Sequence, residues 1–197
     1  VYIGKDAPEE VTAFIEVVST DTVKYEIDKE SGYLRVDRPQ KFSNVVPALY
    51  GFIPQTYCGE KVGALASERT GKKNIMGDGD PIDICVLTEK TLAHGDLLVN
   101  ARPIGGFRMI DGNQADDKII AVLLNDTVYG HLKDINEVPG IVVQRLEHYF
   151  LTYKDMPGQD SNTEIAATYG ADEAFEAIKL SMEDYNLKFD NLGKLLG

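Results

Sequence analysis

The spacing of hydrophobic residues changes along this chain, and that change limits the possible fold more than any other sequence feature. In the segment TVKYEID, Val23, Tyr25 and Ile27 alternate with Lys24 and Glu26, which is the pattern of a strand with one buried face. The segment DKESG then predicts a turn, and residues 33–37 predict the returning strand of a hairpin. Further strands, separated by Gly and Pro residues, are expected at 13–18, 82–87, 97–102 and 118–124.

The last third of the chain has a helical period instead. The apolar face of a first predicted helix consists of Val142, Leu146, Tyr149, Phe150 and Tyr153. A second helix is expected over about 171–188, with an apolar face at Phe175, Ile178, Met182 and Tyr185. Strands followed by helices predict an α+β, mainly β fold, a small barrel with two or more helices packed on it. We expect a single domain, 1–197, with a surface loop at 58–77, which lacks periodicity, and a C-terminal helical segment at 158–197.

The charge and the apolar content restrict the partners of the protein. The net charge is −12, whereas nucleic acids and anionic membranes bind surfaces rich in Lys and Arg, so neither is expected as a partner. No segment approaches the ~20 apolar residues that span a bilayer, and the N-terminus has no export signal, so a cytoplasmic protein is expected. Cys58 and Cys85 lack metal-ligand spacing; we expect a loop thiol and a buried strand thiol, respectively.

An acidic cluster gives the main chemical signal. In DGDPIDIC, Asp78, Asp80 and Asp83 lie directly before an apolar strand. Two unit charges ~4 Å apart repel by about 4 kcal/mol at an effective dielectric near 20. Carboxylates this close therefore favour a bound cation, and ligands that are all oxygen favour Mg²⁺ or Ca²⁺. The alternative is a solvated acidic turn, because Asp, Gly and Pro are common turn residues.

A second acidic group supports the metal interpretation. Asp111, Asp116 and Asp117 precede the strand expected at 118–124, so two acidic sites at strand ends can converge on one metal cluster. Competing motifs fail. An EF-hand would need Ile82 as a ligand and Gly at the position of Asp83, and the residues before the cluster do not form the apolar strand of an aspartyl phosphatase. No phosphate-binding P-loop is present either.

Basic and phenolic residues accompany the carboxylates. Lys24 and Glu26 share one strand face, Arg38 ends a predicted strand, and Tyr153 and Lys154 end the first predicted helix. Each alone fits a structural role, such as a surface ion pair worth at most about 1 kcal/mol. Together they favour phosphoryl transfer, in which metals activate a water molecule and cationic side chains hold phosphoryl oxygens.

Up to about Pro157 the chain resembles the soluble family I inorganic pyrophosphatases. The strongest match is DGDPIDIC, which is similar to that family's D-x-D-P-x-D signature. Supporting matches are FIEVV, KYEIDKESG, LRVDRP, LYGFIP, ARPIG, DGNQADDK and HYFLTYKDM. The resemblance implies a five-stranded, OB-like barrel that hydrolyses pyrophosphate to two orthophosphates with several Mg²⁺ ions, for which Mn²⁺ or Zn²⁺ are possible substitutes. It also implies a homo-oligomer, a hexamer or a dimer.

The same resemblance implies a role for each candidate site residue. The metal ligands would be Asp78, Asp83, Asp116, Asp111, Glu16 and Glu26. Asp80 matches the general base for the metal-bridged water, and Tyr50 matches a phenol that takes part in catalysis and substrate binding. The phosphate-holding positions are Lys24, Arg38, Lys118, Tyr153 and Lys154. Arg102 is expected to support the site structurally.

Three features depart from the family pattern and bear on metal affinity and substrate access. Val46 stands where many bacterial members have tyrosine, Gly112 replaces an acidic residue, and the segment 58–77 is longer than in compact bacterial members. Two other functions stay open: a phosphoanhydride hydrolase of broader specificity, and an OB-like barrel that binds nucleic acid. The net charge of −12 disfavours the second.

Overall fold

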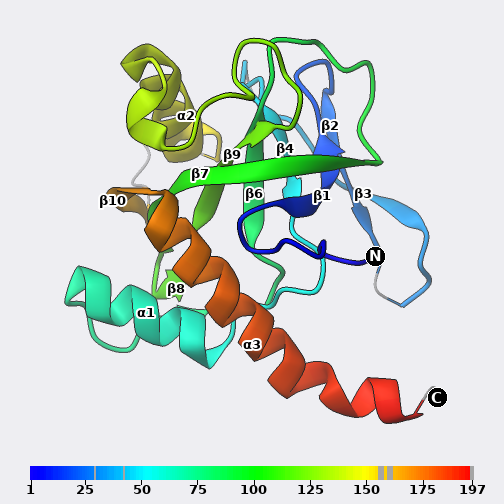
Figure 1. Ribbon diagram of the computed structural model, residues 1–197, viewed down its shortest axis with the longest axis vertical. Coiled ribbons are helices and arrows are strands. Elements are labelled where there is room, and N and C mark those ends of the chain that lie inside the picture. Colours follow the sequence, from blue (N-terminus) through cyan, green and yellow to red (C-terminus); the bar gives the residue numbers. More distant parts are fainter. Residues whose placement is uncertain (29, 42, 155–157, 159–161, 196–197) are drawn as a thin grey trace.

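Five strands close into a ring because β1 pairs with a partner on each side. The order around the ring is β1 (Val11–Val17), β4 (Leu49–Phe52), β6 (Asp83–Leu87), β9 (Lys118–Leu123) and β7 (Leu97–Asp111). Figure 1 shows these strands at the centre of the molecule. The structure is a computed structural model that describes residues 1–28, 30–41, 43–154, 158 and 162–195. The predicted five-stranded barrel is confirmed.

The remaining strands extend or flank this ring. β2 (Val23–Ile27) and β3 (Leu34–Pro39) form the predicted hairpin, which is a separate two-stranded sheet. The short strands β5 (Met76–Gly77) and β8 (Gln114–Ala115) pair with each other, and β8 also pairs with β7. β10 (Thr163–Gly170) pairs with the second half of β7. That half was not predicted to be a strand, since the expectation ended at residue 102.

The helices lie on both sides of β7. α2 (Gly140–Thr152) follows a short 3-10 helix, η1 (Ile135–Glu137), and lies on one side, whereas α1 (Glu60–Thr70) and α3 (Ala171–Leu195) lie on the other (Figure 1). Both predicted helices are present, and α3 extends beyond its predicted end. None of the described helices is long and apolar enough to cross a bilayer.

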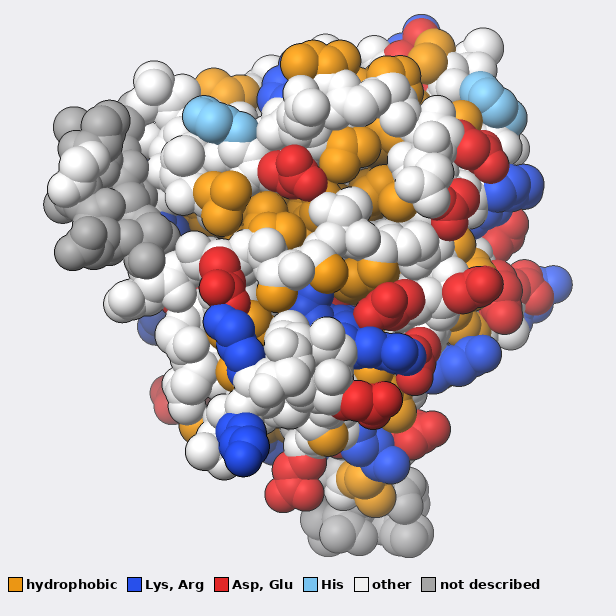
Figure 2. Space-filling view, turned by 90° about the vertical axis from the view of Figure 1, so that its left-hand side faces the viewer, with side chains coloured by type: hydrophobic (Ala, Val, Ile, Leu, Met, Phe, Trp, Pro, Cys, Tyr) orange, Lys and Arg blue, Asp and Glu red, His pale blue; other side chains and the backbone are white. Residues whose placement is uncertain are grey.

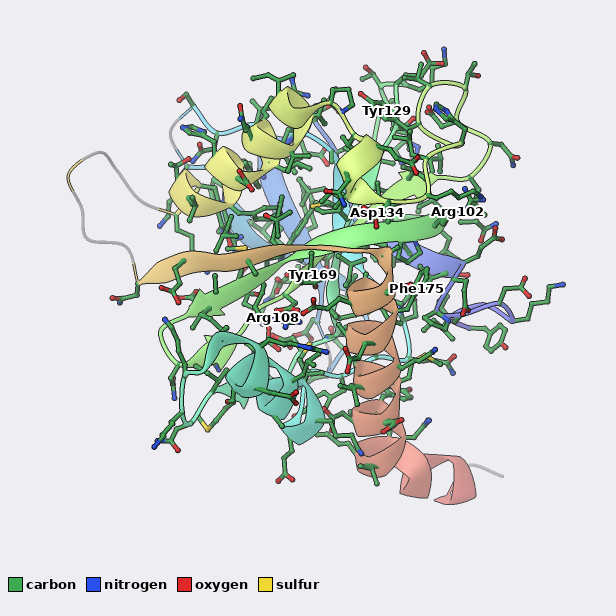
Figure 3. All side chains as sticks on the ribbon, turned by 60° about the vertical axis from the view of Figure 1, so that its left-hand side comes forward. Arg102, Arg108, Tyr129, Asp134, Tyr169 and Phe175 are labelled. Atoms are coloured by element: carbon green, nitrogen blue, oxygen red, sulfur yellow. The ribbon has the colours of Figure 1, made fainter. Side chains whose placement is uncertain are left out.

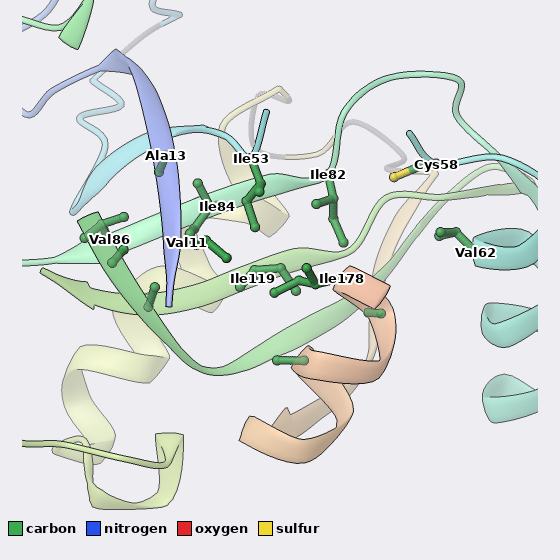
Figure 4. Packing of buried hydrophobic residues seen from close by; sticks show 14 of the residues in the cluster. Val11, Ala13, Ile53, Cys58, Val62, Ile82, Ile84, Val86, Ile119 and Ile178 are labelled. Carbon is green, nitrogen blue, oxygen red and sulfur yellow. The ribbon is translucent and has the colours of Figure 1, made fainter. Parts of the chain in front are cut away.

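Strand alternation divides the buried hydrophobic residues into two clusters. Ile84 and Val86 of β6 enter the first cluster, whereas Cys85 and Leu87 enter the second. All five ring strands contribute to the first cluster, which continues onto α1 and α3 through Val62 and Ile178 (Figure 4). The second cluster packs against α2 through Leu146, Tyr149 and Phe150. Since each fully buried large side chain contributes roughly 1.5–3 kcal/mol to stability, the two clusters together stabilise the ring and the packing of the helices on it.

The segment 58–77 was wrongly predicted to be a surface loop. It contains α1, whose side chains Val62, Leu65 and Ala66 are buried. Cys58 lies in a loop between β4 and α1, as predicted, and is only 2% exposed, and Cys85 is a buried strand thiol as predicted. The segment 158–197 is not wholly helical either, because its described part includes β10. Asp155 and Met156, the end of the HYFLTYKDM match, lie outside the described residues.

The hairpin has its exposed and less exposed faces reversed relative to the sequence prediction. Tyr25 and Ile27, expected to be buried, are 42% and 41% exposed. The Lys24 side chain on the other face is only 13% exposed, because it turns toward Glu16 of β1. The alternation was correctly identified, but the polar face is the one that turns inward.

Charged side chains of both signs share the surface. On the face in Figure 2, Asp and Glu side chains are interspersed with Lys and Arg side chains. Local ion pairs tie the α1 region to its neighbours, with Lys72 bound to Glu164 of β10 and Arg69 Nη2 2.8 Å from Glu176 of α3. Exposed pairs of this kind contribute at most about 1 kcal/mol each.

Candidate active site

The parallel pairing of β6 and β9 brings the two acidic groups together. Asp83 and Lys118, the first residues of these strands, are register partners. The Lys118 ammonium donates to Asp83 Oδ2 at 2.5 Å and also to the carboxylate of Asp116. Tyr50 of β4 donates its hydroxyl to the same Asp83 oxygen at 2.6 Å. Asp83 and Asp116, taken from the two predicted acidic groups, therefore share one cation.

Burial makes the charges of this centre unusual. Burial alone would lower the pKa of Lys118, but Asp116 and Asp83 raise it well above its ordinary value. Burial raises the pKa of Asp116, and it raises the pKa of Asp78 to about 7, with repulsion from Asp116 and Asp83 adding to the effect. Lys118 therefore stays protonated, and these carboxylates lie in a place that favours an additional cation.

Glu16 of β1 and the hairpin form a second part of the site. Lys24 Nζ lies 2.5 Å from Glu26 and 3.6 Å from Glu16. Burial raises the pKa of Glu16 to about 7, against the attraction of Lys24 and with repulsion from Asp83. Lys24 Nζ is also 6.0 Å from the centre of the Tyr50 ring, which links this part to Asp83.

The end of α2 supplies a third part. Lys154 Nζ donates to Asp111 Oδ2 at 2.6 Å, and this hydrogen bond lowers the pKa of Asp111. Two cations lie near the Tyr153 ring centre, the Arg38 guanidinium at 5.7 Å and Lys154 Nζ at 5.5 Å. β3, α2 and the end of β7 thus meet here.

Backbone hydrogen bonds and the Asp78 carboxylate hold the DGDP loop. The Cys58 N–H donates to the Asp80 carbonyl at 2.8 Å, and the Gly79 N–H donates to the Cys58 carbonyl at 3.0 Å. The Asp80 N–H donates to Asp78 Oδ1 at 3.0 Å. The Asp80 residue is exposed at the edge of the loop, a position that a water molecule can reach.

Asp117 does not join the site, although the sequence grouped it with Asp111 and Asp116. In an extended segment successive side chains point to opposite faces, so Asp116 and Lys118 face the site and Asp117 faces away. Its carboxylate is bound by the buried Arg108, with Nη2 2.9 Å from Oδ2. Sequence reasoning did not identify Arg108. The alternation of side chains was the signal that could have separated Asp117 from its neighbours.

The departures from the family pattern have structural explanations in two cases. Val46 is 1% exposed and belongs to the second hydrophobic cluster. Gly112 has φ +64°, the left-handed conformation that favours glycine, in the turn between β7 and β8. Arg102, in the first half of β7, donates to the Gly130 carbonyl at 2.9 Å and to Glu10 at 3.3 Å. These contacts lie toward the end of β7 that is opposite to Asp111.

The donor set fits a hard divalent cation by its chemistry. Among the described residues, no three His, Cys, Asp or Glu side chains already stand as a ready-made metal site. Carboxylate oxygens are nevertheless supplied by Asp78, Asp116 and Glu16. Burial raises the pKa of each of these carboxyl groups. Oxygen ligands of this kind select ions such as Mg²⁺, and a bound ion would stabilise the ionised carboxylates that burial disfavours here.

Comparisons with known proteins give the same family throughout. The family model for inorganic pyrophosphatase matches residues 13–186. The chain is 51% identical over 188 residues to the inorganic pyrophosphatase of Chlamydia trachomatis, covering 93% of this chain and 90% of the relative. It is 38% identical to a soluble inorganic pyrophosphatase of rice, Oryza sativa, covering 93% of this chain and 76% of that one. The crystal structure of the Thermus thermophilus inorganic pyrophosphatase superposes with a TM-score of 0.78 at 30% identity, covering 94% of this chain and 97% of the other. The chain belongs to the inorganic pyrophosphatase family.

Proposed function

We propose that this protein hydrolyses inorganic pyrophosphate to two orthophosphates and uses divalent metal ions, with Mg²⁺ as the principal one. The observation that carries the proposal is the placement of Lys118 between Asp83 and Asp116. Carboxylates that hold metal ions and cations that hold phosphoryl oxygens must lie side by side for phosphoryl transfer. Lys24 and Lys154 pair with further carboxylates, those of Glu16 and Asp111, and Arg38 lies against Tyr153.

The carboxylates are assigned the metal-binding role. Asp78, Asp83 and Asp116 would hold the cations closest to the reaction, with Asp111, Glu16 and Glu26 at the periphery. Bound metal ions would lower the pKa of a water molecule and neutralise charge on the phosphoryl groups. Asp80, exposed at the loop edge, would accept a proton from the attacking water.

The basic and phenolic side chains are assigned the binding of substrate. Lys118, Lys154 and Lys24 each pair with a carboxylate, and Arg38 and Tyr153 lie against one another. Cations held this close to the carboxylates are suited to binding phosphoryl oxygens. Tyr50 donates to Asp83, so it would orient that carboxylate as well as contact substrate.

The test compares phosphate release from pyrophosphate by the native protein and by Asp80→Asn, with and without Mg²⁺. Fast release that requires Mg²⁺ and falls at least about 100-fold in the variant is expected if Asp80 is the general base. Asp6→Asn is a suitable control, since Asp6 is an exposed partner of Lys5 and should leave the rate unchanged. Absence of phosphate release from folded native protein would rule the proposal out.

A substrate panel separates this function from a broader phosphoanhydride hydrolase. With Mg²⁺, pyrophosphate should be hydrolysed at least tenfold faster than ATP if the cations of the site are placed to hold a small, highly charged substrate. Equal rates on both substrates would favour the broader activity. Salt-sensitive retention of single-stranded DNA would instead favour a nucleic-acid-binding barrel.

The proposal also includes the oligomeric state of the protein, the extent of its domain and its cellular location, and the family likeness supports it. We propose that residues 1–197 act as one domain in a homo-oligomer, a hexamer or a dimer, in the cytoplasm. Sedimentation velocity of the purified protein tests the assembly, and a monomer at micromolar concentration would contradict it.

A further inference from the structure

A buried ion pair lies directly behind the candidate active site. The Arg108 side chain of β7 is 1% exposed and that of Asp117 is 2% exposed. Arg108 Nε lies 3.3 and 3.2 Å from the two Asp117 oxygens, and Nη2 lies 2.9 Å from Oδ2. The guanidinium therefore holds the carboxylate through two nitrogens, which fixes its orientation as well as its position.

Neighbouring elements hold this pair in place. The Tyr169 hydroxyl of β10 donates to Asp117 Oδ2 at 2.9 Å, and its ring centre lies 5.0 Å from Arg108 Cζ. Glu173, in the first turn of α3, accepts from Arg108 Nη1 at 2.8 Å. Figure 3 shows Arg108 and Tyr169 on the side of β7 that faces α1 and α3. Asp117 is thus anchored to β7 and β10 directly, and to α3 through Arg108.

The anchored residue lies between two site residues. Asp116 and Lys118 flank Asp117 in the sequence and bind each other on the opposite face. The backbone of this segment is paired to β7 on both sides of Arg108, through the Asp116 N–H to the Met109 carbonyl at 3.0 Å and the register of Lys118 with Phe107. Because Asp116, Asp117 and Lys118 share one backbone segment, the anchor on Asp117 adds to this pairing and restrains the orientation of the Asp116 carboxylate and the Lys118 ammonium.

We infer that Arg108, Asp117 and Tyr169 are positioning residues, which set the geometry of Asp116 and Lys118 for metal and substrate binding. The consequence for catalysis rests on the proposed function. A purely stabilising role is the competing explanation. It is physically weak, because the cost of removing both charges from water offsets much of their attraction, and apolar side chains of similar size often stabilise a core equally well. Directed hydrogen bonds do what apolar packing does not, since they fix an orientation.

The test uses that difference between packing and orientation. The variant with Arg108→Met, Asp117→Leu and Tyr169→Phe together removes the charges of the pair and leaves no buried hydroxyl without an acceptor. Glu173, which is 29% exposed, keeps Arg69 Nε at 3.7 Å. Urea unfolding reports its stability, and calorimetric titration with Mg²⁺ in the absence of pyrophosphate reports the metal site. We expect near-native stability together with Mg²⁺ affinity weakened about tenfold, the lower end of the effect of removing groups that orient metal ligands. Native Mg²⁺ affinity in this folded variant would overturn the inference.

Two further variants complete the design. Asp134→Ala is the matched control: Asp134 Oδ2 accepts from the Ala171 N–H at 3.0 Å and so holds the same end of α3, without contact to Asp117. It should lower stability and leave Mg²⁺ affinity native.

If the apolar variant does not fold, Tyr169→Phe decides, because it removes one hydrogen bond from Asp117. A Mg²⁺ affinity weakened about two- to threefold supports positioning, and native affinity overturns it. Lack of phosphate release by the native protein would refute only the proposed function, since these titrations contain no substrate.

Discussion

Among single residues, Lys118 holds the central place in the site. Its side chain is 2% exposed, and it binds both Asp83 and Asp116, so its charge offsets a repulsion that would otherwise act between two half-buried carboxylates. The ammonium lies 5.8 Å from the centre of the Phe150 ring, which covers it on one side. One buried cation thus connects the two acidic groups of the candidate site.

Replacing Lys118 by Met should therefore reduce kcat for pyrophosphate by about 100-fold or more, the usual result of removing a pre-organised charge from a phosphoryl or acyl transfer site. Methionine keeps the aliphatic volume of the chain, so the loss would reflect charge. Lys90→Met is the control, since the Lys90 side chain is 73% exposed and pairs only with Glu89 among the contacts described. Steady-state phosphate release measures both, and a Lys118→Met enzyme with native kcat would remove Lys118 from the catalytic groups.

Sequence reasoning selected carboxylates that the structure brings close together, but it did not identify the residues that surround them. Asp78, Asp83 and Asp116 stand out because dense acidic groups at strand ends are chemically unusual. Arg108 was not identified, because a single arginine in a strand gives no sign of a partner nine residues away. The pairing of β7 with the segment that leads into β9 brings the two side chains together, and β10 and α3 add contacts to them. Local sequence patterns contain no information on such packing.

At the scale of elements, the hidden helix α1 shows why local signals fail. Its N-cap, Gly59, has no side chain, so no capping residue precedes it in the sequence. A carboxylate distant in the chain caps it instead: Asp184 of α3 accepts from the N–H groups of Gly59 and Lys61 at 3.0 Å and of Val62 at 3.2 Å. The reversed faces of β2 have a similar cause, since its polar face borders the polar site rather than water.

Asp184→Ala should lower the free energy of unfolding by about 1–2 kcal/mol, the cost of removing a helix cap. Asp184 is only 5% exposed, so water replaces the lost acceptor poorly. Urea unfolding gives the magnitude, and hydrogen exchange should show faster opening of α1. Glu183→Ala is the matched control, because Glu183 forms only an exposed pair with Lys61 among its described contacts and should change stability by less than about 0.5 kcal/mol. Equal effects of the two substitutions would contradict the capping role.

At the scale of the whole molecule, the placement of carboxylates links metal binding to stability. Burial raises the pKa values of Glu16 and Asp78 to about 7. By contrast, hydrogen bonds from Lys154 and from the Asn136 backbone lower the pKa values of Asp111 and Asp134, respectively. In the unfolded chain all four have ordinary values near 4. The two groups therefore affect stability in separate pH ranges, the second only below about pH 4.

In EDTA, the free energy of unfolding should fall as the pH rises from 5 to 7.5. Over this range the folded protein retains protons on Glu16 and Asp78 that the unfolded chain has already released, and the state that binds more protons loses relative stability as the pH rises. One pKa unit corresponds to about 1.4 kcal/mol, so the fall should reach roughly a few kcal/mol. Urea unfolding at several pH values measures it.

Mg²⁺ should oppose this fall because metal ions bind the ionised carboxylates and displace their protons. The stabilisation by Mg²⁺ is therefore expected to be small at pH 5 and to grow toward pH 7.5. Asp78→Asn removes one of the two titrating carboxylates, so its stability in EDTA should depend less on pH than that of the native protein, and Mg²⁺ should stabilise it less. A steady rise of stability in EDTA between pH 5 and 7.5 would contradict this prediction. It would mean that the carboxylates of the site are already ionised without metal, and that their ionisation does not destabilise the fold.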